Sequence, residues 1–557
     1  MNFDFIVVGG GSAGCVLAAR LSENPDATVL LLEAGPTDSN PYIHMPAGFF
    51  ELFRRTHNPY AFNYATAPNA SVHDRAMALR QGKVLGGGSS INAMVYTRGC
   101  ADDYNRWAFE QGCDGWSFDD VLPAFRAIEN NEMFADVYHG TEGPVGISNP
   151  ISPNPLSKVF IQACQQAGLP YNPDFNGRTQ AGCGLYQLTQ RDGRRSSSAR
   201  AFLGSAKGRK NLTIMTGAAA KRLVIRSGRA VGIVFDKDRR EQVAMADREI
   251  VLSSGAIGSP KLLMLSGIGP AAHLDALSIA VEHDLPGVGQ NFHDHLNVDM
   301  VYGLTGPFSL ERYAKRYMKL LAGAEYLMFR RGPVTSNIAE AGAFWFADTA
   351  SRQPDLQFHF MLGANIQPGM PAMTGRWGCT LDSYYSRPRS RGSVTLRSAD
   401  PADPPLIDPA YLTEQHDVEM SVNGAEISRE IMRKPAFSSY VSGEHYPADG
   451  ARTRVQMEDF IRRFGRTAHH PAGSCKMGTD AMAVVDPRLR VHGIDGLRIA
   501  DSSIMPSLVN SNTNFPCMMI GERASRMMLG NQTAESAART LPQTEIPHAD
   551  SSPLSAL

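Results

Sequence analysis

Two segments near the end of the chain carry side chains suited to proton transfer. Thr467-Ala-His-His-Pro471 places His469 and His470 side by side before a proline, and Val509-Asn-Ser-Asn-Thr-Asn514 supplies three asparagines. An unperturbed imidazole has a pKa of about 6.5, so near pH 7 it is neutral often enough to accept a proton. A neutral amide can hold a developing alkoxide in a dry pocket. These residue types suit contacts to a hydroxyl group better than a catalytic carboxylate would.

The N-terminal segment predicts the fold that must position those side chains. Phe5 to Val8 is a continuous apolar run, typical of a strand buried on both faces. Gly9, Gly11 and Gly14 follow at G-x-G-x-x-G spacing, and the stretch from Cys15 to Leu21 predicts a helix. The first glycine makes the tight turn, the second lets the backbone approach a pyrophosphate, and the third allows close helix–strand packing. The phosphates would lie at the helix N-terminus, which favours anions.

A second predicted strand, Thr28 to Leu32, ends in Glu33, nineteen residues after Gly14. An acid about 20 residues past the third glycine binds a ribose hydroxyl in dinucleotide folds. Its presence disfavours a 2′-phosphate. The combined pattern therefore predicts dinucleotide binding, with FAD or NAD(H) favoured over NADP(H).

Three further segments predict contacts with the same ligand. Arg80 to Met94 contains three adjacent glycines followed by two serines, which let a large flat ligand press against the main chain. Arg248 to Gly269 predicts a buried strand, a glycine-rich turn and a helix entered at Pro260. Gly496 to Pro506 predicts a short strand that brings Asp501 to the carboxyl edge of a parallel sheet, where ligands bind.

Bulk properties exclude several classes of function. A chain of 557 residues predicts two or more closely packed domains. Its formal net charge of −1 provides no general attraction for nucleic acid. The eight cysteines are scattered without metal-ligand spacing, so we expect reduced thiols and no metal site.

The ends of the chain bear on its location. A cleavable signal peptide would remove the first strand, and no apolar run approaches the roughly 20 residues of a spanning helix. We therefore expect a cytoplasmic protein. The mixed basic and apolar helix predicted over Tyr313 to Arg331 could rest peripherally on the inner membrane or form an ordinary solvated face.

Up to about Leu529 the chain resembles the glucose–methanol–choline (GMC) oxidoreductases, FAD enzymes that oxidise alcohols. Four segments carry the resemblance, in the order of the family: Gly82 to Asn92, Gly255 to Gly269, Leu285 to Leu296, and Pro388 to Leu396. The resemblance implies an α/β FAD-binding Rossmann-like domain and an α+β substrate domain with an antiparallel sheet, interleaved in sequence. The expected division is 1–150, 198–300 and 465–530 for FAD binding and the active site, 151–197 and 301–464 for the substrate domain, and 531–557 for a flexible tail.

The resemblance also assigns residues. His470 matches the catalytic base and Asn512 the second active-site residue, which is His or Asn in different members. His469 stands where relatives often have an aromatic side chain, so it is a pocket wall or a packing residue. Ile91 replaces the histidine that attaches FAD covalently in some members, so FAD should be noncovalent. The FAD-binding residues expected from all these segments are Gly9, Gly11, Ser12, Ala13, Gly14, Glu33, Ala34, Val84, Gly87, Ser89, Asn92, Ala93, Ala220, Ala500, Asp501 and Asn514.

The substrate and the electron acceptor stay open. Phe344, Phe358 and Phe360 are the expected aromatic wall of the substrate pocket, and the resemblance favours bacterial dehydrogenases of aliphatic primary alcohols and polyethylene glycols. Glu340 could instead anchor choline, but a buried, hydrogen-bonded structural role is favoured for it. A quinone and O₂ are both compatible acceptors. The oligomeric state, monomer or small homo-oligomer, is not fixed.

Three other classes of protein are alternatives to an FAD-dependent alcohol oxidoreductase. A lyase or photoenzyme on the same fold, an NAD-dependent dehydrogenase and a nonenzymatic flavin-binding protein are the rivals. The pairing of His470 with Asn512 favours alcohol oxidation over a lyase or photoenzyme. The later glycine-rich segments and the Asp501 segment disfavour an NAD-dependent dehydrogenase, and a nonenzymatic protein would leave His470 without a role.

Overall fold

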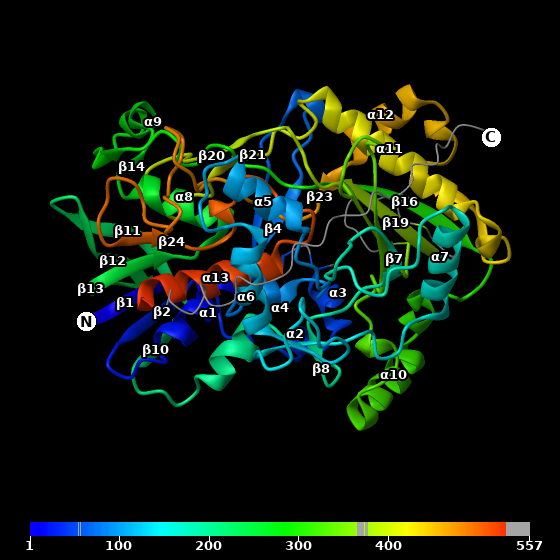
Figure 1. Cartoon of the computed structure of the whole chain (residues 1–557), viewed down its shortest axis with the longest axis horizontal. Coiled ribbons are helices and arrows are strands. Elements are labelled where there is room, and N and C mark those ends of the chain that lie inside the picture. Colours follow the sequence, from blue (N-terminus) through cyan, green and yellow to red (C-terminus); the bar gives the residue numbers. More distant parts are fainter. Residues whose placement is uncertain (54, 56, 365–372, 374–376, 531–557) are drawn as a thin grey trace.

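The computed structural model describes residues 1–53, 55, 57–364, 373 and 377–530. A β-sheet lies toward each end of the molecule, and helices and loops fill the space between them (Figure 1). The predicted tail, 531–557, lies outside the described residues. The residue limits expected for the domains stay a prediction.

The first sheet has the order β10-β2-β1-β13-β12-β11, with β24 also paired to β13. Strands β10, β2, β1, β13 and β24 run parallel, and β11 and β12 extend the sheet as an antiparallel meander. Ile6 and Val7 are fully buried, as expected of a central strand covered on both faces. The strands span β1 (Asn2–Val8), β2 (Val29–Glu33), β10 (Leu212–Thr216), β11 (Ala218–Arg226), β12 (Arg229–Lys237), β13 (Arg240–Leu252) and β24 (Leu497–Ile499).

Two helices from opposite ends of the sequence pack together beside this sheet. Helix α1 (Ser12–Leu21) begins directly after the glycine turn, and α13 (Asn514–Leu529) is the last described helix. The Ser12 hydroxyl donates to Oδ1 of Asn514 at 2.8 Å, which joins the two helix N-termini. A Cβ at Gly521 would lie 2.7 Å from the carbonyl oxygen of Ala13, so the close approach requires glycine there.

Helix α8 corrects one prediction. It spans Gly255–Leu265, so Pro260 lies inside the helix and does not start it. Proline cannot donate to the carbonyl four residues earlier, which here belongs to Ala256. The hydroxyl of Ser474 donates to that carbonyl instead. A distant segment thus compensates the missing helical hydrogen bond.

The chain changes direction between two consecutive strands of this sheet, β10 and β11. Strand β10 ends at Thr216 and β11 begins at Ala218, and Gly217 between them has φ +65°. The first pairs in parallel with β2 and the second antiparallel with β12, so the chain must turn at this point.

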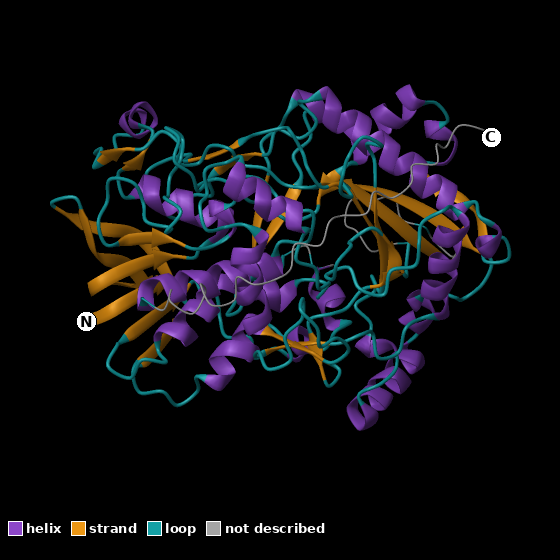
Figure 2. Cartoon of the chain, in the orientation of Figure 1, coloured by secondary structure: helices purple, strands orange, loops and turns teal. Residues whose placement is uncertain are grey.

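The second sheet is antiparallel throughout and has the order β22-β16-β19-β18-β17-β7, with β23 paired to β16. Phe160 on α7 stacks on Phe360 with ring centres 4.9 Å apart, so this helix packs on the sheet (Figure 2). The elements are β7 (Gly182–Leu185), β16 (Leu296–Leu304), β17 (Ala341–Trp345), β18 (Leu356–Met361), β19 (Trp377–Tyr385), β22 (Val441–Tyr446), β23 (Arg466–Thr467), α7 (Pro155–Gln166), α11 (Gln415–Met432) and α12 (Arg454–Phe464).

The remaining helices and strands lie outside these two sheets. They are α2 (Pro41–His44), α3 (Gly48–Phe53), β3 (Ala61–Ala65), β4 (Ala78–Gly82), α4 (Gly88–Ile91), α5 (Ala101–Phe109), α6 (Phe118–Ile128), β5 (Glu129–Asn131), β6 (Val145–Ile147), β8 (Gln190–Arg191), β9 (Arg194–Arg195), β14 (Ile268–Gly269), α9 (Ala271–Ala276), β15 (His283–Asp284), α10 (Arg316–Phe329), β20 (Ser393–Thr395) and β21 (Leu406–Asp408). Strand β7 precedes β10 in sequence but pairs with β17 of the second sheet, so the two units are interleaved as expected.

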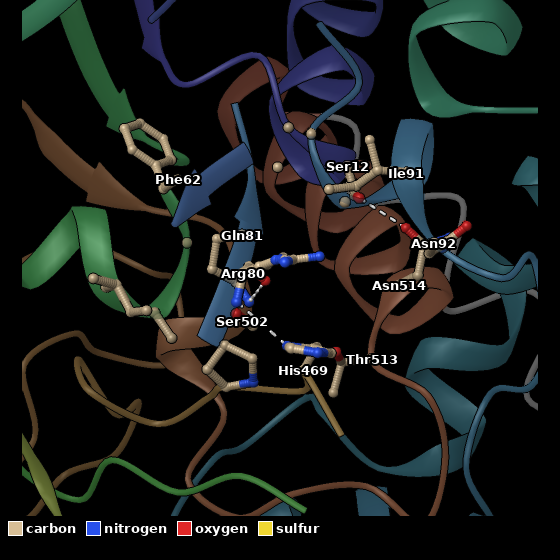
Figure 3. Close-up of a pocket in the computed structure, with 18 of the residues that line it drawn as sticks. Ser12, Phe62, Arg80, Gln81, Ile91, Asn92, His469, Ser502, Thr513 and Asn514 are labelled. Carbon is tan, nitrogen blue, oxygen red and sulfur yellow. Dashed lines mark hydrogen bonds between the residues drawn. The ribbon is translucent and has the colours of Figure 1, made fainter. Parts of the chain in front are cut away.

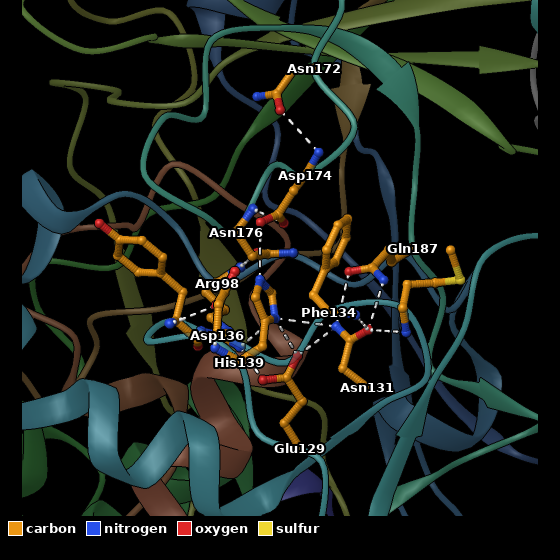
Figure 4. Close-up of polar contacts among 12 residues, drawn as sticks. Arg98, Glu129, Asn131, Phe134, Asp136, His139, Asn172, Asp174, Asn176 and Gln187 are labelled. Carbon is orange, nitrogen blue, oxygen red and sulfur yellow. Dashed lines mark hydrogen bonds and ion pairs between the residues drawn. The ribbon is translucent and has the colours of Figure 1, made fainter.

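A buried ionic network holds the segment around Arg98 in place (Figure 4). Arg98 pairs with Glu129, and Glu129 also lies 2.8 Å from Nδ1 of His139. The second ring nitrogen of His139 lies 3.0 Å from Asp174. These carboxylates raise the pKa of His139 to about 9 against the opposing effect of burial, so the imidazole is charged at neutral pH.

Candidate active site

A cavity of about 480 Å³ lies where the two units meet. Its wall combines the turn before α1, the end of β2, the glycine-rich segment around Gly87, the start of α8, strands β18 and β19, and the segments around His470 and Asn512. Figure 3 shows Ser12 beside Asn514 on one part of this wall and Arg80 beside His469 on another.

One end of the cavity has the features of a dinucleotide site. Gly11 is the N-cap residue of α1, and no side chain hydrogen-bonds to the N–H groups of the first turn. Ser12 and Ala13 of that turn lie on the cavity wall, so these N–H groups provide an anion site. Glu33 accepts hydrogen bonds from the backbone N–H groups of Gly10 at 2.9 Å and Gly35 at 2.7 Å. Burial raises the pKa of the Glu33 carboxyl to about 7.

Close backbone contact holds this end of the cavity together. A Cβ on Gly87, whose φ is +52°, would lie 2.7 Å from Cα of Gly11, so two glycine-rich segments touch directly. Asp501 is fixed by hydrogen bonds from the hydroxyl of Ser259 at 2.6 Å and the N–H groups of Gly255 and Ser503. These contacts hold the Asp501 carboxylate in place at the cavity wall.

Most of the expected site residues come together here. The cavity wall includes Gly9, Gly11, Ser12, Ala13, Glu33, Ala34, Gly87, Asn92, Ala93, Ala220, Asp501 and Asn514, together with His469, His470 and Asn512. These positions are drawn from both ends of the sequence.

Four expected cofactor residues lie behind the wall. A Cβ on Gly14 would lie 1.9 Å from the carbonyl oxygen of Gly9, so this glycine serves helix packing. The Ser89 hydroxyl donates to the carbonyl of Gly86 at 2.6 Å, within its own turn. Val84 packs in an apolar cluster, and the N–H of Ala500 is bonded in the sheet to Leu252. Gly14, Val84, Ser89 and Ala500 thus have packing or hydrogen-bonding roles in the structure, and their contact with FAD stays a prediction.

His470 lies on the cavity wall within hydrogen-bonding distance of Asn512. Its Nε2 is 3.1 Å from Nδ2 of Asn512. Oδ1 of Asn512 accepts from the Gln357 amide at 3.0 Å and is 3.2 Å from the Thr97 hydroxyl. Because the oxygen is already occupied by donors, the Asn512 nitrogen faces the imidazole and donates to it. Nε2 of His470 is therefore the unprotonated ring nitrogen.

A second histidine completes this assignment. Nδ1 of His470 is 3.0 Å from Nδ1 of His295, whose Nε2 is 2.9 Å from the carbonyl oxygen of Ser386. The Ser386 carbonyl can only accept, so His295 donates through Nε2 and accepts through Nδ1. His470 must then carry its proton on Nδ1. The chain of contacts fixes one tautomer, in which the Nε2 lone pair accepts from Asn512 at the cavity wall.

Burial keeps both imidazoles neutral. It lowers the pKa of His295 to about 4 and moves that of His470 well below its ordinary value, with further lowering by neighbouring histidines. The neutral form is the one that accepts a proton.

The segment that supplies His295 also holds the His470 backbone. Oδ1 of Asp294 accepts from the N–H of His470 at 2.7 Å, and its Oδ2 accepts from the hydroxyls of Tyr411 at 2.6 Å and Thr467. Asp294 and His295 were not expected as site residues, although they lie in the segment Leu285 to Leu296 that carried part of the resemblance. Their adjacent acid and imidazole were the signal that could have identified them.

His469 is part of the cavity wall. Its backbone has φ +63°, a left-handed conformation that is uncommon outside glycine. Its Nδ1 accepts from the N–H of Arg80 at 3.4 Å, and its ring meets Phe53 edge to face at 5.7 Å. The turn at His469 aims the following residue, His470, toward Asn512.

The three aromatic residues expected in the substrate pocket lie outside it. Phe358 and Phe360 face away from the cavity on β18, and Phe344 is buried in a separate aromatic cluster. The next residues along β18, His359 and Met361, line the cavity instead. Side chains alternate between the faces of a strand, and both faces of β18 are buried, so the apolar pattern did not indicate which face meets the ligand.

The polar part of the wall was also missed. His359 pairs with Asp382 at 3.0 Å, and Nδ2 of Asn297 is 3.3 Å from the other oxygen of that carboxylate. Tyr384 hydrogen-bonds to Gln357, which in turn reaches Asn512. These residues come from three strands of the second sheet, and no local motif marks them.

Glu340 does not reach the cavity. It is fully buried and accepts from the N–H of Asn154 at 2.6 Å and the hydroxyls of Ser157 and Ser336. Its role is structural, as the sequence allowed. Among the described wall residues the carboxylates are Glu33, Asp382 and Asp501.

The sequence matches the GMC oxidoreductase family over residues 3–297 and 388–521. The chain belongs to the GMC oxidoreductase family. It is 41% identical over 534 residues to an oxygen-dependent choline dehydrogenase of Rhizobium etli, covering 96% of each chain. It is also 41% identical over 531 residues to an alcohol dehydrogenase [acceptor] of Pseudomonas putida, covering 95% of this chain and 96% of that one.

Solved GMC structures have the same fold. A pyridoxine 4-oxidase from Mesorbium loti superposes with a TM-score of 0.86 at 35% identity, covering 95% of this chain and 99% of the other. A variant of Aspergillus oryzae formate oxidase, studied for FAD modification, gives a TM-score of 0.89 at 28% identity over 96% of this chain and 99% of the other. This GMC oxidoreductase is an FAD-dependent enzyme acting on alcohols.

The cavity fits FAD on its own features. The uncapped N-terminus of α1, the touching glycines and the carboxylate of Glu33 lie along one wall, and the imidazole–amide pair lies on the same cavity. Ile91 lines this cavity and offers no nucleophile for covalent attachment.

Proposed function

We propose that this GMC oxidoreductase oxidises an aliphatic primary alcohol to an aldehyde, with His470 as the base and Asn512 as the donor to the developing alkoxide. The observation that carries the proposal is the fixed tautomer of His470, whose Nε2 lies 3.1 Å from the Asn512 amide on the cavity wall. A hydroxyl inserted between the two groups would replace their hydrogen bond, donating to Nε2 and accepting from Nδ2.

The chain's own groups account for the proton. Neutral His470 takes the hydroxyl proton on Nε2, and the amide of Asn512 stabilises the negative charge that develops on oxygen. Bound FAD supplies the acceptor for the hydride at flavin N5. The hydrogen bond from His470 Nδ1 to His295 keeps the imidazole oriented while it gains charge. We propose noncovalent FAD, because Ile91 stands at the attachment position.

The wall supports an uncharged, largely apolar substrate. Apolar side chains from separate segments line it, namely Phe49, Phe53, Ile91, Val95, Ile338 and Met361. Asp382, a carboxylate among the described wall residues, is paired with His359, and Arg466 on the same wall is paired with Asp299. A quaternary ammonium group would therefore meet no free carboxylate among these residues.

The test is anaerobic flavin reduction by His470→Gln in the dark. We expect reduction by an alkanol to slow at least about 10²-fold while FAD stays bound. His492→Gln, a histidine away from the cavity wall, is the matched control and should reduce at the parental rate. Unchanged reduction in His470→Gln would remove the base assignment. Failure of any alcohol to bleach the parental flavin would favour a lyase or photoenzyme.

Choline is the second candidate substrate, because curated relatives at 41% identity carry that name. Comparing the reduction rates with choline and with an alkanol of similar length decides between them. A faster rate with choline would overturn the proposed substrate class.

We propose a quinone or O₂ as the electron acceptor. Peroxide yield under air, measured with and without a soluble quinone, separates the two. Among the described residues no helix is both long and apolar enough to span a bilayer. A cytoplasmic location with peripheral membrane contact stays a prediction, as does the oligomeric state.

A further inference from the structure

Helix α10 presents an apolar face away from the protein. Its large apolar side chains are 59% to 74% exposed, and they are Tyr317, Leu320, Leu321, Leu327, Met328 and Phe329. The helix protrudes at the margin of the molecule, far from the first sheet (Figure 1). Soluble surfaces rarely gather this many large apolar side chains on one short element, so the face indicates an interaction site.

The contact between α10 and the body uses the opposite side of the helix. Ala322 and Tyr326 are its buried residues, and the Tyr326 hydroxyl donates to the carbonyl of Gly193 at 3.0 Å. Positions 317, 320, 321, 324, 327 and 328 recur at helical spacing and form the outer face. The outer face of this helix is therefore largely apolar, where a surface helix usually presents polar side chains to solvent.

Basic residues surround the apolar face. Residues 312–331 contain six basic side chains and one acidic side chain, Glu325. The basic residues are Arg312, Lys315, Arg316, Lys319, Arg330 and Arg331. The whole chain has a formal net charge of −1, so this excess is local. An apolar face with flanking Lys and Arg is the pattern of a helix that lies in the interface of an anionic membrane.

We propose that α10 docks this enzyme on an anionic phospholipid surface, with the outer apolar residues in the acyl boundary and the basic residues against the headgroups. The basic residues around α10 favour an anionic membrane over a second copy of the chain as the partner of this face. Two copies joined through α10 would bring their basic residues together, whereas an anionic bilayer neutralises them.

The docked surface lies close to the cavity. Lys319 on α10 is 3.2 Å from Glu51 on α3, and Phe49 and Phe53 of that same helix line the cavity. Docking would therefore bring the bilayer next to the wall of the active site. An apolar acceptor or substrate dissolved in the bilayer would then be near its site of use.

Vesicle co-sedimentation of the purified holoenzyme tests the proposal. The probes are phosphatidylcholine vesicles and vesicles that also contain phosphatidylglycerol. We expect binding to the anionic vesicles, weakened at high salt because exposed charges are screened. Leu320→Gln combined with Leu327→Gln should weaken it at least about tenfold. Lys315→Gln combined with Arg316→Gln should weaken it severalfold.

Matched controls alter equally exposed residues elsewhere. Phe109→Gln combined with Val455→Gln changes two apolar side chains that are 77% and 76% exposed, and should leave binding unchanged. Turnover of a soluble alcohol with a soluble dye should stay at the parental level in every variant, so this test is independent of the proposed chemistry. Absence of parental binding to anionic vesicles, or equal binding to both vesicle types, overturns the proposal. A parental dimer that Leu320→Gln with Leu327→Gln dissociates, without vesicle binding, assigns the face to a second copy and also overturns it.

Discussion

Replacing His295 should slow flavin reduction without removing FAD. His295→Leu deletes the acceptor that lies 3.0 Å from Nδ1 of His470 and leaves that N–H buried and unpaired. An unpaired buried donor costs about 1–3 kcal/mol. If that cost falls on the reacting geometry, reduction slows about 5- to 150-fold, since about 1.4 kcal/mol corresponds to a tenfold change in rate. His295→Gln keeps an acceptor oxygen, so its rate of flavin reduction should fall less than that of His295→Leu.

The assay is stopped-flow flavin reduction under anaerobic conditions, with FAD content checked by the visible spectrum. We expect the limiting rate to fall while the apparent affinity for alcohol changes little, because His295 lies behind the base. The parental rate should be constant between about pH 6 and 8, because the reactive form is neutral and burial places the pKa of His470 well below its ordinary value. Parental speed in His295→Leu would refute the positioning role. Equal losses in His295→Leu and His295→Gln would show that ring packing matters and not the acceptor.

Three further outcomes follow from the geometry. Gly87→Ala should lower FAD affinity or content, because its Cβ would lie 2.7 Å from the backbone of Gly11. The control is Gly204→Ala, which lies away from the cavity wall, meets nothing within 4 Å and should bind FAD normally; equal FAD titrations of the two variants would contradict this. Acid precipitation should release all the flavin, since Ile91 cannot form a covalent link, and flavin left on the pellet would refute noncovalent binding. The raised pKa of His139, about 9, contributes stability that is fully present below about pH 6.5 and is lost as the pH rises through 9. Denaturation midpoints of the parent should fall as the pH rises across that range, and those of His139→Gln should fall less. Identical pH profiles of the two proteins would show that His139 does not contribute to this pH dependence.

Local sequence was sufficient for the dinucleotide half of the site. The spacing of Gly9, Gly11 and Gly14 sets the turn and the start of α1 through steric limits that act within a few residues. Glu33 follows at the end of the adjacent strand, where pairing in the parallel sheet must place it beside the turn. The adjacency of His470 to Pro471 and the position of Asn512 also predicted two side chains that the structure places 3.1 Å apart, because each lies in a short segment with a recognisable pattern. Their catalytic roles stay a proposal.

Only the tertiary structure decided which side chains complete the substrate end. Strand β18 is buried on both faces, so its sequence could not show that His359 meets the cavity while Phe358 and Phe360 pack behind it. The proton position on His470 depends on His295, 175 residues away, and the irregular helix at Pro260 depends on Ser474. Hydrogen bonds of this kind join residues that are close only after the chain has folded. The sequence therefore determined the kind of chemistry, and long-range packing determined the geometry in which it can occur.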